Sequence, residues 1–446
     1  MLRPDRDHSG RAPDSVAAGA SERVTSPTRT RSRGHYMTCG QMMLGSKRTR
    51  PALARLPHRA LSSLLVLALI TAFALGATGP AGAQAEFSVK AAQALLMDAD
   101  TGAIMYQRNA DELMYPASMS KLMTLTVLFK ALKDGEVKLS DEYLMSENAW
   151  RKGGAPSGTS AMFVPLGTRV SVEDLIKGIT VQSGNDAAIS VAENMSGAED
   201  LFAARMTAEA RVLGLSKSVF KNATGLYQPD HVTTARELAL LARHVIQVYP
   251  DYYGYFALKE FPYRKHKFIN RNPLLNLVAG IDGLKTGFIK ESGYGIVASA
   301  KQDGRRLIAV LNGCATAEER RDEARRLMEW GFKNFTEVKL FDAGEVVGHA
   351  RVLGGERMFV PLTGNGDVNI WLARQPANPR LKAQIIYNGP LKPPLRKGEQ
   401  VARLRVTAPN ETTNEVPLYV AEDVGRAGVM RRGLDTLLYL ATRWIP

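Results

Sequence analysis

Apolar side chains recur along the chain with two different spacings, and their order predicts an α+β domain. Residues 92–108 form two strand-like runs around the turn residues 98–102, a pattern typical of a β-hairpin. Apolar residues at three- and four-residue intervals follow and predict helices. These helices cover residues 118–133, 171–180, 186–195, 199–213 and 234–247. A second hairpin spans residues 293–313 and precedes a charged helix from about residue 317 to 333, so strands at both ends of this region are expected to share one antiparallel sheet.

The spacing changes again after about Phe335. Residues 336–422 consist of short alternating runs, for example EVVGHARV and VARLRV, separated by Gly, Pro and Asn clusters, which predicts a small all-β domain. The last segment, residues 423–446, has one apolar face with arginines elsewhere. Its apolar side chains are Met430, Leu434, Leu437, Leu438, Ala441, Trp444 and Ile445. An amphipathic helix at a membrane surface fits this segment better than the alternative, a helix packed on its own domain.

Residues 1–85 have the pattern of an N-terminal extension followed by a secretory signal peptide. Residues 61–77 are mostly apolar and follow five basic residues, and an A-x-A cleavage signal ends at Ala83 or Ala85. The exported protein is therefore expected to begin near Glu86. The alternative is an uncleaved membrane helix, although 17 residues fall short of the span of about 20 that a bilayer needs. Residues 1–41 precede Met42 and fit a start codon that has been placed upstream of the true one.

Charge and composition narrow the function classes. The net charge is +14, but residues 1–85 hold 12 Lys or Arg against 4 Asp or Glu, which leaves only +6 for the remainder and argues against a nucleic-acid partner. The exported chain keeps one cysteine, Cys314, which follows a strand-like run and is expected to be a buried core residue. The histidines are scattered without metal-ligand spacing. We therefore predict no metal and no cofactor.

A candidate nucleophile stands at the start of the first predicted helix. Ser118 and Lys121 form an S-x-x-K motif directly after Tyr115-Pro116-Ala117, and their spacing of three residues places both side chains on one helix face. A helix N-terminus favours a developing anion. To act as a general base near neutral pH, the lysine has to lower its pKa by about three units through burial and a neighbouring positive charge.

One S-x-x-K motif is weak evidence, because Ser218 and Lys221 form a second copy. Two further motifs, Ser183-Gly184-Asn185 in a break between helices and Lys285-Thr286-Gly287, follow the first in order. Each is an ordinary turn composition by itself, and a second S-x-N begins at Ser146. Their joint occurrence in this order indicates a serine acyl-transfer site.

These three motifs resemble the set shared by penicillin-binding proteins and serine β-lactamases. The flanking segments YPASMSKLMT, KGITVQSGNDAAISVAE, FKNATGL, HVTTARELA, NRNPLL, DGLKTGF and SGYGIVASA are similar to those of the low-molecular-mass D-alanyl-D-alanine carboxypeptidases, peptidase family S11. The resemblance covers residues 86–335 nearly end to end. That family also carries a C-terminal β domain and a terminal amphipathic membrane helix, in the order expected here for residues 336–422 and 423–446.

The resemblance implies a role for each motif residue. Ser118 would be acylated by the D-Ala-D-Ala end of a peptidoglycan stem peptide, Lys121 would take its proton, and Ser183 would relay a proton to the leaving D-Ala. The remaining residues would bind substrate: Asn185 at a peptide carbonyl, Lys285, Thr286 and Gly287 at the terminal carboxylate and along the strand edge, and Phe288 with its N–H in the oxyanion hole. Arg271 and Arg320 are further candidates for carboxylate binding, with structural salt bridges as the alternative.

The resemblance also implies partners and a location. The substrate is a stem peptide ending in D-Ala-D-Ala, β-lactam antibiotics are inhibitors, and the C-terminal helix places the enzyme on the periplasmic face of the inner membrane. Phe288 and Ile289 depart from the His and Thr found in some members, which bears on substrate preference and deacylation. A DD-endopeptidase, a β-lactamase and a non-catalytic peptidoglycan-binding scaffold are the alternatives. The β-lactamase is disfavoured because the second motif is SGN rather than SDN and no E-x-x-L-N segment lies between motifs two and three.

Overall fold

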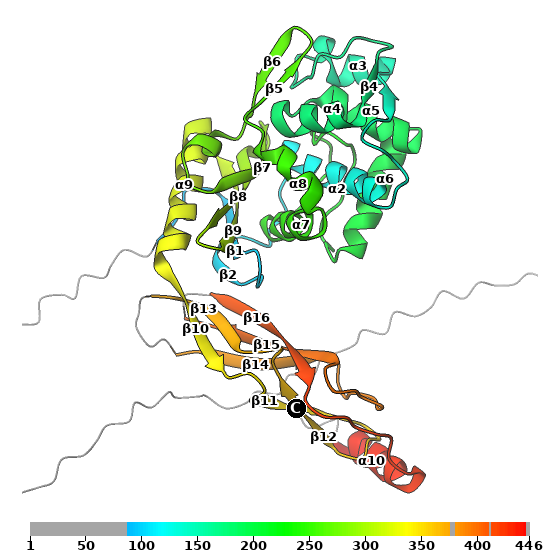
Figure 1. Cartoon of the computed structure of the whole chain (residues 1–446), viewed down its shortest axis with the longest axis vertical. Coiled ribbons are helices and arrows are strands. Elements are labelled where there is room, and N and C mark those ends of the chain that lie inside the picture. Colours follow the sequence, from blue (N-terminus) through cyan, green and yellow to red (C-terminus); the bar gives the residue numbers. More distant parts are fainter. Residues whose placement is uncertain (1–86, 375–379, 410–411, 443–446) are drawn as a thin grey trace, which may run out of the picture.

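The structure is a computed structural model that describes residues 87–374, 380–409 and 412–442. The predicted signal peptide, Cys39, Trp444 and Ile445 lie outside the described residues. In the described part of the chain, a mixed domain of helices and strands is followed by a β domain and a C-terminal helix (Figure 1). The α+β prediction is therefore confirmed.

A five-stranded antiparallel part of one sheet forms the centre of the first domain. Its order is β2-β1-β9-β8-β7, so the strands at the two ends of the domain's sequence are neighbours, as expected. The strands are β1 (Gln93–Asp98), β2 (Ile104–Arg108), β7 (Ile281–Ile289), β8 (Gly293–Gln302) and β9 (Arg305–Cys314). Cys314 is fully buried in the core, which confirms that prediction.

The two faces of this sheet pack on different helices because successive side chains of a strand alternate. Leu95 and Met97 of β1 face the large helical region, whereas Ala94 and Leu96 pack in the cluster of α9 (Ala317–Asn334). Figure 1 shows α9 on one side of the sheet and the other helices of this domain on the opposite side.

The helical region surrounds one central helix, α2 (Lys121–Lys133), whose residues from Lys121 to Phe129 are all buried. Its other elements follow in chain order. They are α3 (Glu147–Gly153), α4 (Val172–Lys177), α5 (Asn185–Ser196), α6 (Glu199–Val212), α7 (Ala235–Val248), α8 (Pro250–Tyr253) and the hairpins β3 (Glu142–Leu144) with β4 (Arg169–Ser171) and β5 (Glu260–Tyr263) with β6 (His266–Ile269).

Two predicted helices differ from the structure at their ends. The helix expected from residue 118 begins as a 3-10 turn, Ala117–Ser120, and becomes α-helical at Lys121. The helix expected over residues 171–180 is α4, which continues as a π-helical turn over Gly178–Gln182. Over so few residues, apolar periodicity does not distinguish a 3-10 or π-helical turn from an α-helix. The number of residues per turn in each of the two differs from that of the α-helix by less than one.

The second domain contains the strands β10 to β16 with a core of its own. They are β10 (Phe335–Phe341), β11 (Val346–Arg351), β12 (Phe359–Thr363), β13 (Val368–Ala373), β14 (Lys382–Tyr387), β15 (Gln400–Thr407) and β16 (Thr413–Val420). It meets the first domain at one strand pair, Thr413 with Ile104, and at Arg305, whose guanidinium carbon lies 3.7 Å from the centre of the Trp371 ring.

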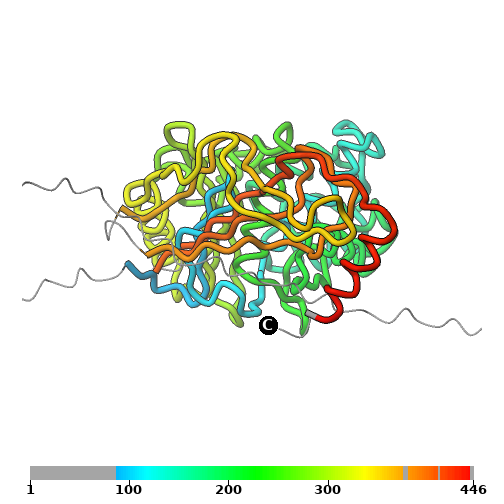
Figure 2. The backbone as a smooth tube through the Cα atoms, turned by 90° about the horizontal axis from the view of Figure 1, so that it is seen from below, coloured from blue at the N-terminus to red at the C-terminus, as the bar shows by residue number. Residues whose placement is uncertain are grey.

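The C-terminal helix α10 (Val429–Thr442) packs only partly on the β domain. Its Asp435 is buried and accepts a hydrogen bond from the backbone N–H of Gly354 at 2.6 Å. Met430, by contrast, is 93% exposed, and Leu437 is 66% exposed. Seen from below, α10 lies at one edge of the β domain (Figure 2). Within the described ranges, no helix combines the length and apolar character required to cross a bilayer.

Candidate active site

Ser118 lies in a tight turn between extended chain and the central helix. The residue before it, Ala117, has φ 49°, a left-handed conformation that is rare for a non-glycine residue and often marks functional sites. Ala117 and Met119 are buried, whereas Ser118 is partly accessible. The turn therefore presents the serine hydroxyl outward from an otherwise buried segment.

Lys121 is fully buried, and its Nζ contacts three oxygen atoms. It lies 3.0 Å from Oγ of Ser118, 2.6 Å from Oδ1 of Asn185 and 2.6 Å from the carbonyl oxygen of Thr224. A neutral lysine amine has two N–H groups and one lone pair. The two carbonyl-type oxygens of Asn185 and Thr224 can only accept, so they occupy both N–H groups. The lone pair of the neutral amine is thereby directed at the Ser118 hydroxyl.

Burial lowers the pKa of Lys121 to about 7, which the S-x-x-K hypothesis requires of a general base. The carboxylates of Asp186 and Glu199 oppose this effect and raise the pKa, while the charge of Arg271 lowers it further. The amine is thus available in its neutral form near neutral pH. Desolvation is the dominant cause, and the neighbouring positive charge expected from the sequence makes the smaller contribution.

A short buried loop presents the Thr224 carbonyl to the lysine. Oδ1 of Asn222 accepts from Thr224 N at 3.1 Å, from Thr224 Oγ1 at 3.0 Å and from Gly225 N at 2.7 Å. Its Nδ2 donates to the Leu226 carbonyl and to Gln228 Oε1. One amide side chain therefore holds the loop by five hydrogen bonds and fixes the direction of the carbonyl.

Ser183 and Asn185 belong to the second motif, and Asn185 contacts the buried lysine. Ser183 has φ 66° at the junction between the π-helical turn and α5, and its Oγ is buried without a hydrogen-bond partner among the described residues. The backbone N–H of Asn185 donates to the Ser160 carbonyl oxygen at 2.7 Å, and its side-chain Nδ2 donates to Thr159 Oγ1 at 2.9 Å. Asn185 is thus fixed by the preceding loop.

Lys285 is also buried, and burial lowers its pKa well below the ordinary range. The charges of Lys121, Arg271 and Arg320 lower this pKa further. Its Nζ donates to the carbonyl oxygen of Thr286 at 3.1 Å. The positive charges of Arg271 and Arg320 therefore reach the Lys285 end of the site, which favours an anionic ligand group such as a carboxylate.

The K-T-G motif lies on β7, the end strand of the sheet in the described part of the chain. A side chain at Gly287 would place its Cβ 3.0 Å from Pro116 O, 3.1 Å from Ala117 Cβ and 3.2 Å from Met119 Cγ. Glycine at this position therefore lets β7 pack closely on the nucleophile turn. An extended peptide can pair with the free edge of such a strand.

The two arginines predicted as weaker candidates form no ion pair with a carboxylate of the described residues, so the salt-bridge alternative finds no support. Arg271 is exposed, and its charge acts on both lysines of the site. The Arg320 guanidinium lies 5.7 Å from the centre of the Tyr294 ring, and its buried Nε lacks a partner among the described residues. Phe288 is 49% exposed and stacks on the same Tyr294 ring at 4.2 Å.

The second S-x-x-K copy is structural. Ser218 is buried and donates to Glu237 Oε2 at 2.5 Å, while its oxygen lies 2.7 Å from Thr233 Oγ1. Thr234 caps α7 by accepting from the Glu237 N–H, and the Glu237 carboxylate accepts from Ser218 Oγ and from Lys217 N. Glu237 therefore joins the start of α7 to the segment of residues 217–218.

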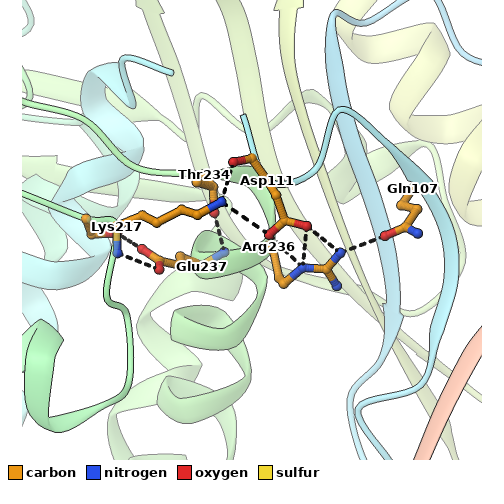
Figure 3. A network of polar contacts seen from close by, with 7 residues as sticks. Gln107, Asp111, Lys217, Thr234, Arg236 and Glu237 are labelled. Atoms are coloured by element: carbon orange, nitrogen blue, oxygen red, sulfur yellow. Dashed lines mark hydrogen bonds and ion pairs between the residues drawn. The ribbon is translucent and has the colours of Figure 1, made fainter. Parts of the chain in front are cut away.

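This region continues into a surface network at the start of α7 (Figure 3). Arg236 binds Asp111 through Nε at 3.0 Å and Gln107 through Nη2 at 2.6 Å, and Lys217 Nζ donates to the Asp111 carbonyl. The hydrogen bond from Arg236 lowers the pKa of Asp111. The network ties the end of β2 to α7 and has a structural role. The other stray motif is structural too, since Ser146 caps α3 by accepting from Ala149 N at 3.0 Å.

The sequence motifs did not identify the Thr224 carbonyl or Asn222. A backbone carbonyl has no side-chain signature, and the only available signal was the similarity of the segment FKNATGL to the carboxypeptidase family. Within the described ranges, no three His, Cys, Asp or Glu side chains are gathered so that they could hold a metal ion.

Two sequence families match the chain. Residues 80–316 match the family described as Peptidase S11, D-alanyl-D-alanine carboxypeptidase, and residues 335–426 match the family described as penicillin-binding protein 5, C-terminal domain. The chain is 36% identical over 388 residues to the D-alanyl-D-alanine carboxypeptidase DacC of Escherichia coli, covering 86% of this chain and 95% of that protein. It is 32% identical over 381 residues to DacF of Bacillus subtilis, a protein of the same description, covering 83% of this chain and 95% of that protein.

Solved structures agree in fold. Penicillin-binding protein 5 from Haemophilus influenzae superposes with a TM-score of 0.64 at 34% identity, covering 76% of this chain and 99% of that chain. The similarity therefore spans the mixed domain and the β domain together.

Proposed function

The chain belongs to the D-alanyl-D-alanine carboxypeptidases of peptidase family S11, and we propose that it removes the terminal D-Ala from peptidoglycan stem peptides through an acyl-enzyme on Ser118. One observation carries the proposal. The buried Lys121 amine, whose pKa is lowered to about 7, lies 3.0 Å from Ser118 Oγ with its two N–H groups occupied by other acceptors. This arrangement provides a neutral base aimed at a serine hydroxyl.

Acylation begins when neutral Lys121 takes the hydroxyl proton of Ser118. The serine oxygen attacks the carbonyl carbon of the penultimate D-Ala, and the resulting oxyanion is stabilised by the N–H groups of Ser118 and Phe288. The peptide bond then breaks, and the leaving amine of the terminal D-Ala receives a proton relayed from Lys121 through Ser183. A water molecule hydrolyses the ester and restores the Ser118 hydroxyl.

The other motif residues hold the substrate. Asn185 binds a peptide carbonyl, and Lys285, Thr286 and Arg320 hold the terminal carboxylate, with Arg271 adding positive charge at the same place. The free edge of β7 pairs with the extended peptide. A β-lactam ring mimics the scissile peptide and acylates the same serine, so penicillins are expected to label the enzyme. The curated relatives that span both domains are carboxypeptidases, which favours this activity over cross-link cleavage.

The two S-x-x-K copies supply a matched test. Ser118→Ala should abolish both labelling by a fluorescent penicillin and release of D-Ala from a stem pentapeptide. Ser218→Ala removes the other S-x-x-K hydroxyl, which contacts Glu237, and should keep both activities. Release of D-Ala by the Ser118→Ala variant would show that the nucleophile is assigned wrongly. Mass spectrometry of products from a cross-linked dimer separates endopeptidase activity from carboxypeptidase activity in the same experiment.

We further propose that residues 1–85 direct export and that the enzyme, with its domains at residues 86–335 and 336–422, works on the periplasmic face of the inner membrane. The helix within residues 423–446 would bind the membrane surface. Support comes from the apolar side chains that α10 leaves exposed, such as Met430 and Leu437. Deleting residues from Gly425 onward should release the protein from membrane pellets while penicillin labelling is kept. Persistent pelleting of the truncated protein would contradict the membrane role of α10.

A further inference from the structure

The hairpin of β5 and β6 carries a cationic surface that the proposed mechanism does not use. Residues 259–271 contain five Lys or Arg and one acidic residue. The hairpin turns at Arg264 and Lys265, and Arg264 has φ 52°, a left-handed conformation in which glycine or asparagine is the usual residue. A strained cation at the tip of a hairpin is an outlier that points to a function outside the fold.

Most of these cations are exposed and unpaired. The side chains of Lys259, Arg264 and Lys265 are exposed, and none of them forms an ion pair with a carboxylate of the described chain. Lys259 lies at the other end of the hairpin, where its carbonyl accepts from the Asn270 N–H at 2.8 Å, so we call Arg264 and Lys265 alone the cationic tip. Lys267 of the same hairpin is paired, with its Nζ 2.8 Å from Glu260, and is not included in the tip.

The hairpin is fixed to the wall of the active site. The exposed His266 ring stacks on Phe163 at 4.9 Å, and Phe163 belongs to the loop that holds Asn185 through Thr159. At the other end of the hairpin, the Arg271 N–H donates to the Val181 carbonyl at 3.2 Å. The hairpin therefore contacts both the loop that holds Asn185 and the turn that precedes Ser183.

The position of the hairpin argues for one class of partner. Figure 1 shows β5 and β6 at the end of the molecule opposite α10. If α10 lies on a membrane, the hairpin points away from it, so an anionic lipid surface is not the partner that this geometry favours. A polymer whose stem peptides also enter the active site can contact both the hairpin and the site.

We propose that the cationic tip binds the acidic stem peptides of a peptidoglycan strand while one stem occupies the active site. This inference rests on the proposed function. Opposite charge attracts such a polymer at long range and raises its local concentration at the site. The tip thus acts on binding of the polymer and of acidic stems, and not on the chemical step at Ser118.

The test compares two charge-matched double variants of the full chain. The tip variant carries Arg264→Glu and Lys265→Glu, and the control variant carries Arg396→Glu and Lys397→Glu, two exposed cations of the β domain. The tip variant should lose about tenfold or more in sedimentation with purified peptidoglycan at low salt. Its KM should rise for an acidic stem pentapeptide but stay unchanged for the amidated peptide, with kcat kept. The control variant should match the unmodified enzyme.

Other outcomes would overturn the proposal. These are an unchanged tip variant, an equal loss in the control variant, and a loss of binding to anionic lipid vesicles rather than to peptidoglycan. Fluorescent penicillin labelling separates this proposal from the proposed function. If the unmodified enzyme is not labelled at Ser118, the proposed function fails. If labelling is normal in all three proteins while peptidoglycan binding is equal, only the cationic tip is refuted.

Discussion

The carbonyl oxygen of Thr224 lies 2.6 Å from Nζ of Lys121, although the two residues are 103 positions apart in the sequence. Together with Asn185 Oδ1, also at 2.6 Å, this carbonyl takes the N–H groups of the neutral amine. Because both N–H groups are used in this way, the lone pair of the neutral amine is directed at the Ser118 hydroxyl. We therefore expect the activity of the motif to depend on a backbone atom of a distant loop.

The pH dependence of acylation should follow Lys121. Its pKa is lowered to about 7, and only the neutral amine accepts the Ser118 proton. The acylation rate should fall about tenfold for each pH unit below that value and level off above it. Glu199→Gln removes a carboxylate that raises this pKa, so its profile should move to lower pH. The pH profiles of the unmodified enzyme and of Glu199→Gln are measured as rates of labelling by fluorescent penicillin over a pH series. Identical midpoints in the two proteins would show that the profile reports another group.

Asn222 should act as a positioning residue. Asn222→Ala removes five hydrogen bonds from the loop that presents the Thr224 carbonyl, and it leaves buried donors unpaired. Unfolding free energy should drop by about 2 kcal/mol, and acylation should slow by about tenfold or more. A purely structural role would lower stability but leave the pH midpoint in place. We expect the midpoint to move because the contacts of Lys121 loosen, whereas Asn222→Asp keeps the acceptor and should retain more activity.

Three glycines give a graded test of how closely the elements pack around the nucleophile turn. Gly225 has φ 81°, and a Cβ at this position would lie 1.9 Å from Ala117 O. Gly225→Ala should therefore lower the free energy of unfolding by about 3 kcal/mol or more. The Cβ added by Gly287→Ala would lie 3.0 to 3.2 Å from its nearest atoms, so this variant should lower the free energy of unfolding by about 1 kcal/mol and slow acylation. Gly254→Ala meets nothing within 4 Å and should be nearly neutral. Thermal unfolding would contradict the packing argument if Gly225→Ala were as stable as Gly254→Ala.

Arg305 and Trp371 should couple the two domains. The guanidinium lies 3.7 Å from the centre of the indole ring, and the same arginine lies 3.5 Å from Asp98 inside the first domain. A double-mutant cycle of Arg305→Ala and Trp371→Ala should give a coupling energy of about 1 kcal/mol. Trp371→Ala should also speed proteolysis between the domains while penicillin labelling is unchanged. Additive effects in the cycle would mean that the stacking contributes nothing.

The elements that could be predicted are those with a local signal. The β1–β2 and β8–β9 hairpins and each of the three motifs depend on residues close together in the chain. The π-helical turn at Gly178–Gln182 could not be predicted, because a few residues carry too little periodicity to show it. The shared sheet of β1 and β9 was inferred from chain order and is confirmed.

The sequence by itself therefore determined the α+β class and the candidate residues, including Ser118 and its motif partners. The order of the three motifs favoured Ser118 over Ser218, and the tertiary structure adds a physical difference: Ser218 is bound to Glu237, whereas Ser118 contacts a buried lysine. Only the tertiary structure decided that Lys121 is buried and that α10 leaves an apolar face exposed. The physical reason is that helix and strand patterns are local, whereas the pKa of a lysine and the exposure of a helix face depend on which distant groups exclude water from them.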